Sequence, residues 1–144
     1  ILYAGSMICV GFLEEIIFRG FLFKAMAKDS VKAAIIVSSI TFGIGHIINL
    51  FNGNSDDPIA TICQIIYAIA IGFLFVIIFY RGGTLLPCII THSVVNALSV
   101  FADESGMTAQ IQIITAVILT IITLIYVIIL NKTLPRRETN EKVF

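Results

Sequence analysis

The sequence has little charge: only 12% of its 144 residues are charged, whereas 58% are hydrophobic. A soluble domain carries roughly 25% charged residues. The deficit argues against a soluble globule and indicates that lipid is the main solvent of the chain. The formal net charge is zero, so the sequence offers no basic surface for nucleic acid, and we expect no nucleic-acid partner.

Cysteine is scarce as well. Cys9, Cys63 and Cys88 are scattered among apolar stretches, a pattern that predicts neither a disulfide framework nor a zinc cluster. We expect all three to be small buried apolar residues. The sequence begins in an apolar run at Ile1, without an initiator methionine, a charged leading segment or a cleavage site. It therefore shows no signal peptide, and we expect it to be part of a longer membrane protein.

Long apolar runs dominate the rest. A hydrocarbon core of about 30 Å requires about 20 apolar residues per helix, and helices satisfy their own backbone hydrogen bonds in lipid. Five segments qualify or nearly so, at residues 1–27, 33–50, 59–80, 84–101 and 108–130. The predicted fold class is therefore all-α: a polytopic transmembrane bundle of about five spanning helices. It forms one domain, residues 1–130, followed by a polar tail, residues 131–144.

The short connectors between these helices alternate in charge. The first connector, the third connector and the tail are mainly basic, whereas the second and fourth connectors are acidic. The basic connector residues are Lys24, Lys28, Lys32 and Arg81, and the acidic ones are Asp56, Asp57, Asp103 and Glu104. Pro58 suits a helix start, and Arg81-Gly82-Gly83 suits a tight break. Basic connectors favour the cytoplasmic side of a membrane. The pattern predicts that the first and third connectors and the C-terminus are cytoplasmic.

A few ionisable residues lie inside the predicted spans. Glu14, Glu15 and Arg19 share the first helix, and the only two histidines, His46 and His92, lie in the second and fourth. An ionisable group within a span costs about 2.5–3.5 kcal/mol even on the lenient insertion scale. Groups that persist at this cost are by default functional, so these five residues are the candidates for a site.

Helical spacing separates their roles. Glu15 and Arg19 are four residues apart, so they can pair on one face and let the helix insert. Glu14 points about 100° away and is left to meet another helix. His92 and Asn96 share a face by the same spacing, whereas Ser93 lies off that face and is assigned to helix packing.

The depths of Glu14, His46 and His92 in the membrane are similar enough for these side chains to meet at one site. At 1.5 Å per residue, Glu14 and His92 each lie about 15–16 Å from the nearest basic connector, and His46 about 21 Å. A carboxylate that takes a proton from water, an imidazole that holds this water, and a second imidazole with an amide for an oxyanion would form a hydrolase site. Hydrogen bonding that merely joins the helices and proton or ion transport remain alternatives.

Three motifs, in order on three predicted helices, resemble those of one family. They are Glu14-Glu15 with Arg19 (Glu-Glu-x-x-x-Arg), Phe42 with His46 (Phe-x-x-x-His), and His92 with Asn96 (His-x-x-x-Asn), with Arg81-Gly82-Gly83-Thr84-Leu85 as the usual lead-in to the third. The family is the CPBP (ABI) intramembrane proteases, which include type II CAAX prenyl endopeptidases and bacterial bacteriocin-processing or immunity proteins. The resemblance covers about residues 5–100, and additional N-terminal helices usual in the family are missing.

The resemblance implies an endopeptidase of a bacterial plasma membrane that cleaves a membrane-associated or lipid-modified peptide or protein. By similarity, Glu14 would be the general base and His46 its partner on the attacking water, while His92 and Asn96 would form the oxyanion site. The supporting residues would be Glu15, Arg19 and Phe42.

The resemblance also raises the question of a metal. The family is often labelled metalloprotease, and Glu14, His46 and His92 would be the zinc ligands. The sequence has no His-Glu-x-x-His motif, and related structures are read as metal-free, so we expect no metal or other cofactor. A non-catalytic immunity or partner-binding protein that keeps the family fold, and a proton-coupled transporter, are the competing functions.

Overall fold

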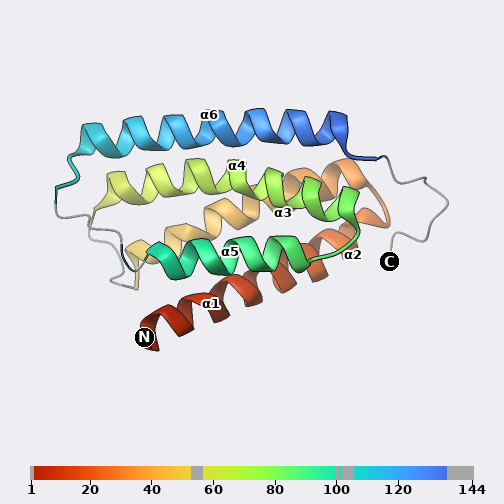
Figure 1. Ribbon diagram of the computed structural model, residues 1–144, viewed down its shortest axis with the longest axis horizontal. Coiled ribbons are helices and arrows are strands. Elements are labelled where there is room, and N and C mark those ends of the chain that lie inside the picture. The colour runs from red at the N-terminus through yellow and green to blue at the C-terminus, as the bar shows by residue number, and fades with distance from the viewer. Residues whose placement is uncertain (1, 53–56, 100, 102–105, 136–144) are drawn as a thin grey trace.

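A computed structural model describes residues 2–52, 57–99, 101 and 106–135. Within these ranges all regular structure is helical (Figure 1). The elements are α1 (Leu2–Glu15), the π-helix η1 (Ile16–Phe23), α2 (Lys24–Ala27), α3 (Val31–Gly45), the 3₁₀ helix η2 (His46–Leu50), α4 (Pro58–Gly82), α5 (Leu86–Ser99) and α6 (Ala109–Thr133). The segments α1–η1–α2 and α3–η2 are each contiguous, so the chain forms five rods at the five predicted positions. The all-α prediction is confirmed.

Three of the five rods are long and apolar enough to cross a membrane by themselves: Val31–Leu50, Pro58–Gly82 and Ala109–Thr133. The helix α5 is apolar but has only 14 residues. The first rod carries the charged residues Glu14, Glu15, Arg19 and Lys24. The architecture is that of a helical membrane bundle. The two rods that are not long and apolar enough to span a membrane by themselves are those that carry Glu14 and His92.

Local chemistry explains where α4 begins and ends. The Asp57 side chain accepts a hydrogen bond from the backbone N–H of Ile59 (2.9 Å), and Pro58 follows as the first helical residue, where its missing N–H costs nothing. At the other end Gly83 has a φ of 75°, and its N–H donates to the carbonyl of Phe79 at 2.8 Å. A glycine takes this left-handed conformation without a Cβ clash.

The chain runs back and forth along the long axis of the bundle (Figure 1). The connectors after α2 and after α4 lie at the same end as the C-terminal end of α6. Lys28, Arg81 and Lys132 therefore belong to one end of the bundle, and Asp57 to the opposite end. This is the threading predicted from the alternation of charge; the acidic residues Asp56, Asp103 and Glu104 lie outside the described residues.

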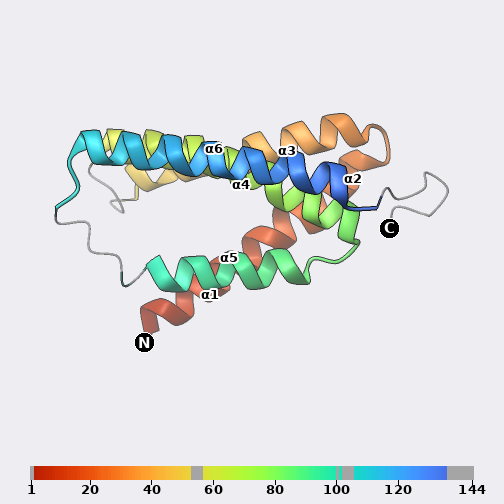
Figure 2. The ribbon, with the colours of Figure 1, turned by 45° about the horizontal axis from the view of Figure 1, so that its top comes forward.

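The rods form two groups, as the turned view in Figure 2 shows. The helices α1 and α5 pack as a pair, while α4 lies between α3 and α6. The segments η1 and α2 leave α1 and pack on α3, which joins the two groups. The functional side chains of α1, η1, α3 and α5 can therefore meet only where these groups come together.

The helix α6 is fastened to α4 at both ends. Arg81 Nη2 donates to the carbonyl oxygen (3.0 Å) and to Oδ1 (2.6 Å) of Asn131, and Gln112 Nε2 donates to Asp57 Oδ2 at 2.9 Å. The helix continues to Thr133, so residues 131–133 of the predicted polar tail are helical. Residues 136–144 lie outside the described residues.

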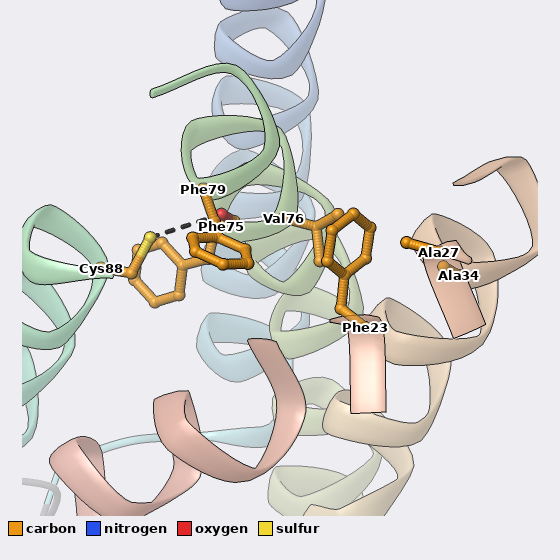
Figure 3. Packing of buried hydrophobic residues seen from close by; sticks show 7 residues of the cluster. All are labelled: Phe23, Ala27, Ala34, Phe75, Val76, Phe79 and Cys88. Carbon is orange, nitrogen blue, oxygen red and sulfur yellow. Dashed lines mark hydrogen bonds between the residues drawn. The ribbon is translucent and has the colours of Figure 1, made fainter. Parts of the chain in front are cut away.

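A cluster of buried apolar side chains joins η1, α2, α3, α4 and α5 (Figure 3): Phe23, Ala27, Ala34, Phe75, Val76, Phe79 and Cys88. The thiol of Cys88 donates to the carbonyl of Phe75 at 3.4 Å, which ties α5 to α4. Cys63 is also buried, but Cys9 is exposed. The prediction of three buried cysteines is therefore wrong for Cys9, because no described element covers its face of α1.

Candidate active site

The charged pair predicted in the first helix is present and buried. Arg19 Nη1 donates to Glu15 Oε1 at 2.8 Å, and neither side chain is exposed (0% each). Arg19 lies in the π-helical segment η1, which follows directly on Glu15. Its Nη2 donates to the carbonyl oxygen of Gly72 in α4 at 3.2 Å. The guanidinium is thus neutralised by Glu15 and anchored to a second helix.

The π-helical segment has a polar partner of its own. Helices with π geometry carry wider hydrogen-bonded rings than α-helices and are frequent at functional sites. The hydroxyl of Ser38 in α3 donates to the carbonyl of Phe18 at 2.9 Å. This contact fastens η1 to α3 in the turn that carries Arg19, so it helps to fix the depth and direction of the guanidinium.

His92 lies between the two glutamates. Its Nδ1 is 2.9 Å from Glu15 Oε1, and its Nε2 is 3.4 Å from Glu14 Oε2. Because Glu15 Oε1 also accepts from Arg19, it is an ionised acceptor, and the Nδ1 of His92 is the donor to it. The Nε2 atom is thereby directed at the second carboxylate, as in sites where a carboxylate fixes the tautomer of a histidine.

A proton shared by Glu14 and His92 would relieve a repulsion and balance the charge of the cluster. A neutral imidazole that is protonated on Nδ1 has a lone pair on Nε2, which would face an oxygen lone pair of an ionised Glu14. A single proton between Nε2 and Oε2 removes this repulsion. It also brings the summed charge of Glu14, Glu15, Arg19 and His92 to zero, which suits a buried site.

Glu14 differs from Glu15 in that its side chain is partly exposed. Its side chain is 29% exposed, against 0% for Glu15. Its Oε2 atom is buried, and apart from the 3.4 Å contact with Nε2 of His92 it has no polar partner among the described residues. As predicted, Glu14 meets another helix, but Glu15 meets the same histidine at a shorter distance, so the prediction that Glu15 pairs only with Arg19 is incomplete. Glu14 is the one of the two that a water molecule can approach.

An aromatic ring connects the second histidine to this cluster. The ring of Phe42 lies 5.6 Å from that of His46 and 5.5 Å from that of His92, measured between centroids, with interplanar angles of 82° and 77°. The carbon Cζ of Arg19 lies 4.3 Å from the centroid of the same ring. Within the described chain no hydrogen bond joins His46 to Glu14. The structure therefore places His46 beside the site, at the start of η2, with Phe42 between the motifs.

Asn96 lies one helical turn beyond His92 on α5 and is half-buried. Its carbonyl accepts from the hydroxyl of Ser99 at 2.7 Å, and in the part of the chain that the structure describes its side-chain amide has no hydrogen bond. The amide is thus uncommitted on the helix that carries His92.

A close crossing of α1 and α5 sets the position of His92. A Cβ atom on Gly11 would lie 2.8 Å from the backbone N of Ser93 and 3.1 Å from the carbonyl carbon of His92. Only glycine permits this approach. Ser93 donates its hydroxyl to the carbonyl of Ile8 at 3.0 Å, so its assignment to helix packing is confirmed.

Two contacts of the cluster come from α4, which carries none of the three motifs. They are the Gly72 carbonyl that receives Arg19 and the ring of Phe75, which lies against both Arg19 and His92. Sequence reasoning missed both residues. The part of α4 that contains them, residues 68–79, is uniformly apolar, and nothing in its composition singles out these two positions.

The residues considered for zinc do not fit a metal site. Among the described residues no group of three or more His, Cys, Asp and Glu side chains is placed to hold a metal ion. Of the three candidate ligands, His92 has a carboxylate at each ring nitrogen, and His46 is turned against Phe42. A zinc ion needs three protein ligands around one open position, which this arrangement does not provide.

Fold and site together define the class: a helical membrane protein with a buried carboxylate–imidazole–guanidinium cluster assembled from separate helices. The sequence model of the family described as "Type II CAAX prenyl endopeptidase Rce1-like" matches residues 1–98, and the chain belongs to this family. The match contains every residue of the cluster and ends before α6. Comparison with curated proteins finds no match, and comparison with solved structures finds none either.

Proposed function

We propose that the chain is an intramembrane endopeptidase in which Glu14 activates a water molecule to attack a peptide carbonyl. The observation that carries this proposal is the placement of one imidazole between two carboxylates of unequal exposure, inside a bundle of apolar helices. A structural role alone would be served by the pair of Glu15 and Arg19, which is already neutral. The additional glutamate, reachable and held against His92, needs a further reason.

The geometry supports the following roles. The shared proton resides on Nε2 of His92, which leaves Glu14 ionised and able to accept a proton as water adds to the carbonyl carbon. His46, whose ring packs against Phe42 at the edge of the cluster, is assigned to holding this water. The Nε2–H of His92 and the side-chain amide of Asn96 stabilise the oxyanion that develops. When the C–N bond breaks, the proton on Glu14 passes to the leaving amine, and Glu14 is ionised again.

Glu15, Arg19 and Phe42 support this reaction without taking part in proton transfer. Glu15 accepts from Nδ1 of His92 and keeps Nε2 directed at the reacting groups. Arg19 balances the charge of Glu15. No metal ion enters the proposed reaction, because each step is assigned to a side chain of this cluster.

An apolar groove beside the cluster supports a membrane-associated or lipid-modified peptide as the substrate. It has a volume of about 510 Å³ and lies between α1 and α5; its lining consists of Ile8, Ile89, Ile90, Ser93, Val94, Ala97 and Leu98. Two of these residues, Ser93 and Ala97, directly follow His92 and Asn96 on α5. A lipid chain or an apolar side chain in the groove would bring the neighbouring peptide bond to the cluster.

The charge of the two ends supports an orientation. We place the end that carries Lys28, Arg81 and Lys132 in the cytoplasm, since basic residues accumulate there. The C-terminus is then cytoplasmic, and the bacterial plasma membrane is the proposed location.

A peptide-release assay in proteoliposomes tests the proposal. The full-length protein is given fluorescent peptides that carry either a prenyl group or a single apolar membrane segment. We expect Glu14→Gln to lower the rate by about a hundredfold or more, as loss of a general base does, while the matched amide substitution Asp57→Asn at the end of the bundle retains the rate. Unchanged cleavage by Glu14→Gln would overturn the proposal. So would proton flux that depends on Glu14 in liposomes where neither peptide is cleaved.

A further inference from the structure

Phe75 of α4 lies against two members of the cluster. Its ring centroid is 5.6 Å from that of His92, at an interplanar angle of 42°, and 5.4 Å from Cζ of Arg19. The side chain is almost fully buried (4% exposed). Figure 3 shows it at the edge of the apolar cluster, next to Cys88. Phe75 belongs to no motif of the sequence, yet it reaches the residues of two motifs.

Phe42 contacts the same two residues from α3. Its ring centroid is 5.5 Å from that of His92 and 4.3 Å from Cζ of Arg19. We call Phe42 and Phe75 the aromatic clamp. The two residues that the clamp contacts, Arg19 and His92, are also the hydrogen-bond donors to Glu15 Oε1. The clamp therefore packs against both partners of Glu15.

The two contacts are of kinds that depend on an aromatic ring. A guanidinium within about 6 Å of a ring centroid is attracted by the negative face of the ring, and more strongly when water is absent. An imidazole packed against a ring is held in one plane, which an aliphatic side chain of similar volume would not enforce. Phe75 thus holds a cation in place and restricts the rotation of a histidine at the same time.

We propose that Phe75 is a positioning residue of the site, which keeps the ring of His92 in the orientation that directs Nδ1–H at Glu15 and Nε2 at Glu14. Its effect on the reaction rate rests on the proposed function, whereas its effect on His92 does not. The hydrogen bond from Cys88 reaches the backbone carbonyl of Phe75, so a substitution of the ring leaves that link between α4 and α5 available.

Nitrogen NMR of histidine-labelled protein in nanodiscs reads the hydrogen bonding of each ring nitrogen directly, because the chain has only two histidines. For Phe75→Leu we expect the two nitrogen signals of His92 to shift and broaden, because the ring no longer keeps one orientation between Glu15 and Glu14. We expect kcat to fall about tenfold with KM unchanged, which corresponds to about 1.4 kcal/mol. Phe75→Tyr, which keeps the ring, should restore both. The matched control is Phe79→Leu, one turn further along α4, whose ring lies against Phe23 instead.

The possible results distinguish the positioning role of Phe75 from the proposed function. If Phe75→Leu keeps both the wild-type nitrogen signals and kcat, Phe75 is a core residue only and the inference is wrong. If Phe75→Leu does not fold, a fluorinated phenylalanine at position 75 keeps the shape of the ring and weakens its negative face, and the same shift of the His92 signals is expected. If Glu14→Gln cleaves normally while Phe75→Leu alters the nitrogen signals of His92, the proposed function fails and the positioning role stands.

Discussion

The Nδ1 atom of His92 lies 2.9 Å from Oε1 of Glu15, although 77 residues of chain separate the two. The contact gives two adjacent glutamates different environments. Glu15 is completely buried and shared by Arg19 and His92, whereas Glu14 is partly exposed and, among the described residues, its polar contact is with His92. We therefore expect substitutions of the two residues to affect different properties of the protein.

Glu15→Gln should destabilise the protein, and Glu14→Gln should not. Without the charge of Glu15, the buried guanidinium of Arg19 is left unpaired, which costs about 3–5 kcal/mol of the free energy of unfolding. In Glu14→Gln the new amide can donate to Nε2 of His92, so we expect a change of about 1 kcal/mol or less. Unfolding by SDS in mixed micelles measures both values. Equal losses of stability in the two variants would contradict this division of roles.

Gly11→Ala should reduce activity by displacing His92, although Gly11 itself takes no part in the proposed reaction. The added methyl group meets the backbone of Ser93 at 2.8 Å and must push α5 away from α1. Because a shift of about 1 Å in a reacting group can cost about a hundredfold in rate, we expect a loss of this order in kcat. Gly5→Ala is the matched control in the same helix, since a Cβ there meets nothing within 4 Å. Full activity of Gly11→Ala would show that this crossing does not set the site.

The contact between α4 and α6 should weaken in acid. The hydrogen bond from Gln112, with those from the backbone N–H groups of Ala60 and Ile59, holds the pKa of Asp57 below its usual range. A lowered pKa in the folded state contributes stability that is present at neutral pH and is lost as the pH falls through that value. Unfolding measured between about pH 6 and about pH 2 should therefore show a loss of stability in acid.

The variant Asp57→Asn tests the source of that loss. Asparagine also caps helices well, but it does not titrate, so the variant should lose less stability in acid than the wild type. Asp29→Asn, at the opposite end of the bundle, should behave like the wild type. If Asp57→Asn keeps the full acid dependence, another group is responsible.

Removal of metal ions should leave the reaction intact. Since Glu14, His46 and His92 do not form a metal-binding group, we expect unchanged peptide release after treatment with EDTA or phenanthroline. The purified protein should also bind no zinc by calorimetry in the micromolar range. Loss of activity with a chelator that is restored by added zinc would overturn the proposed chemistry.

Most of the fold could be predicted because its signals are local. The lengths of the apolar runs predicted every rod to within three residues at each end, and Pro58 and Gly83 mark the ends of α4 as expected. The spacing of Glu15 and Arg19 predicted their ion pair. The π-helical geometry of Ile16–Phe23 could not be predicted, since it depends on partners such as Ser38 on another helix.

The candidate site was predictable in its membership but not in its connections. The ionisable residues stood out because lipid makes each of them costly. Which nitrogen of His92 meets which glutamate depends on the crossing of α1 and α5, and this has no signature beyond a single glycine, Gly11. Phe75 remained hidden because an aromatic residue in an apolar helix is ordinary until its neighbours are known.

The short helix α5 has a consequence for the surrounding bilayer. With 14 residues, it is about 21 Å long, whereas the hydrocarbon layer is about 30 Å thick. Lipid beside a span that is too short becomes locally thinner. The membrane is then thinnest along the helix that carries His92 and Asn96, which shortens the path from the aqueous phase for the water that a hydrolytic reaction consumes.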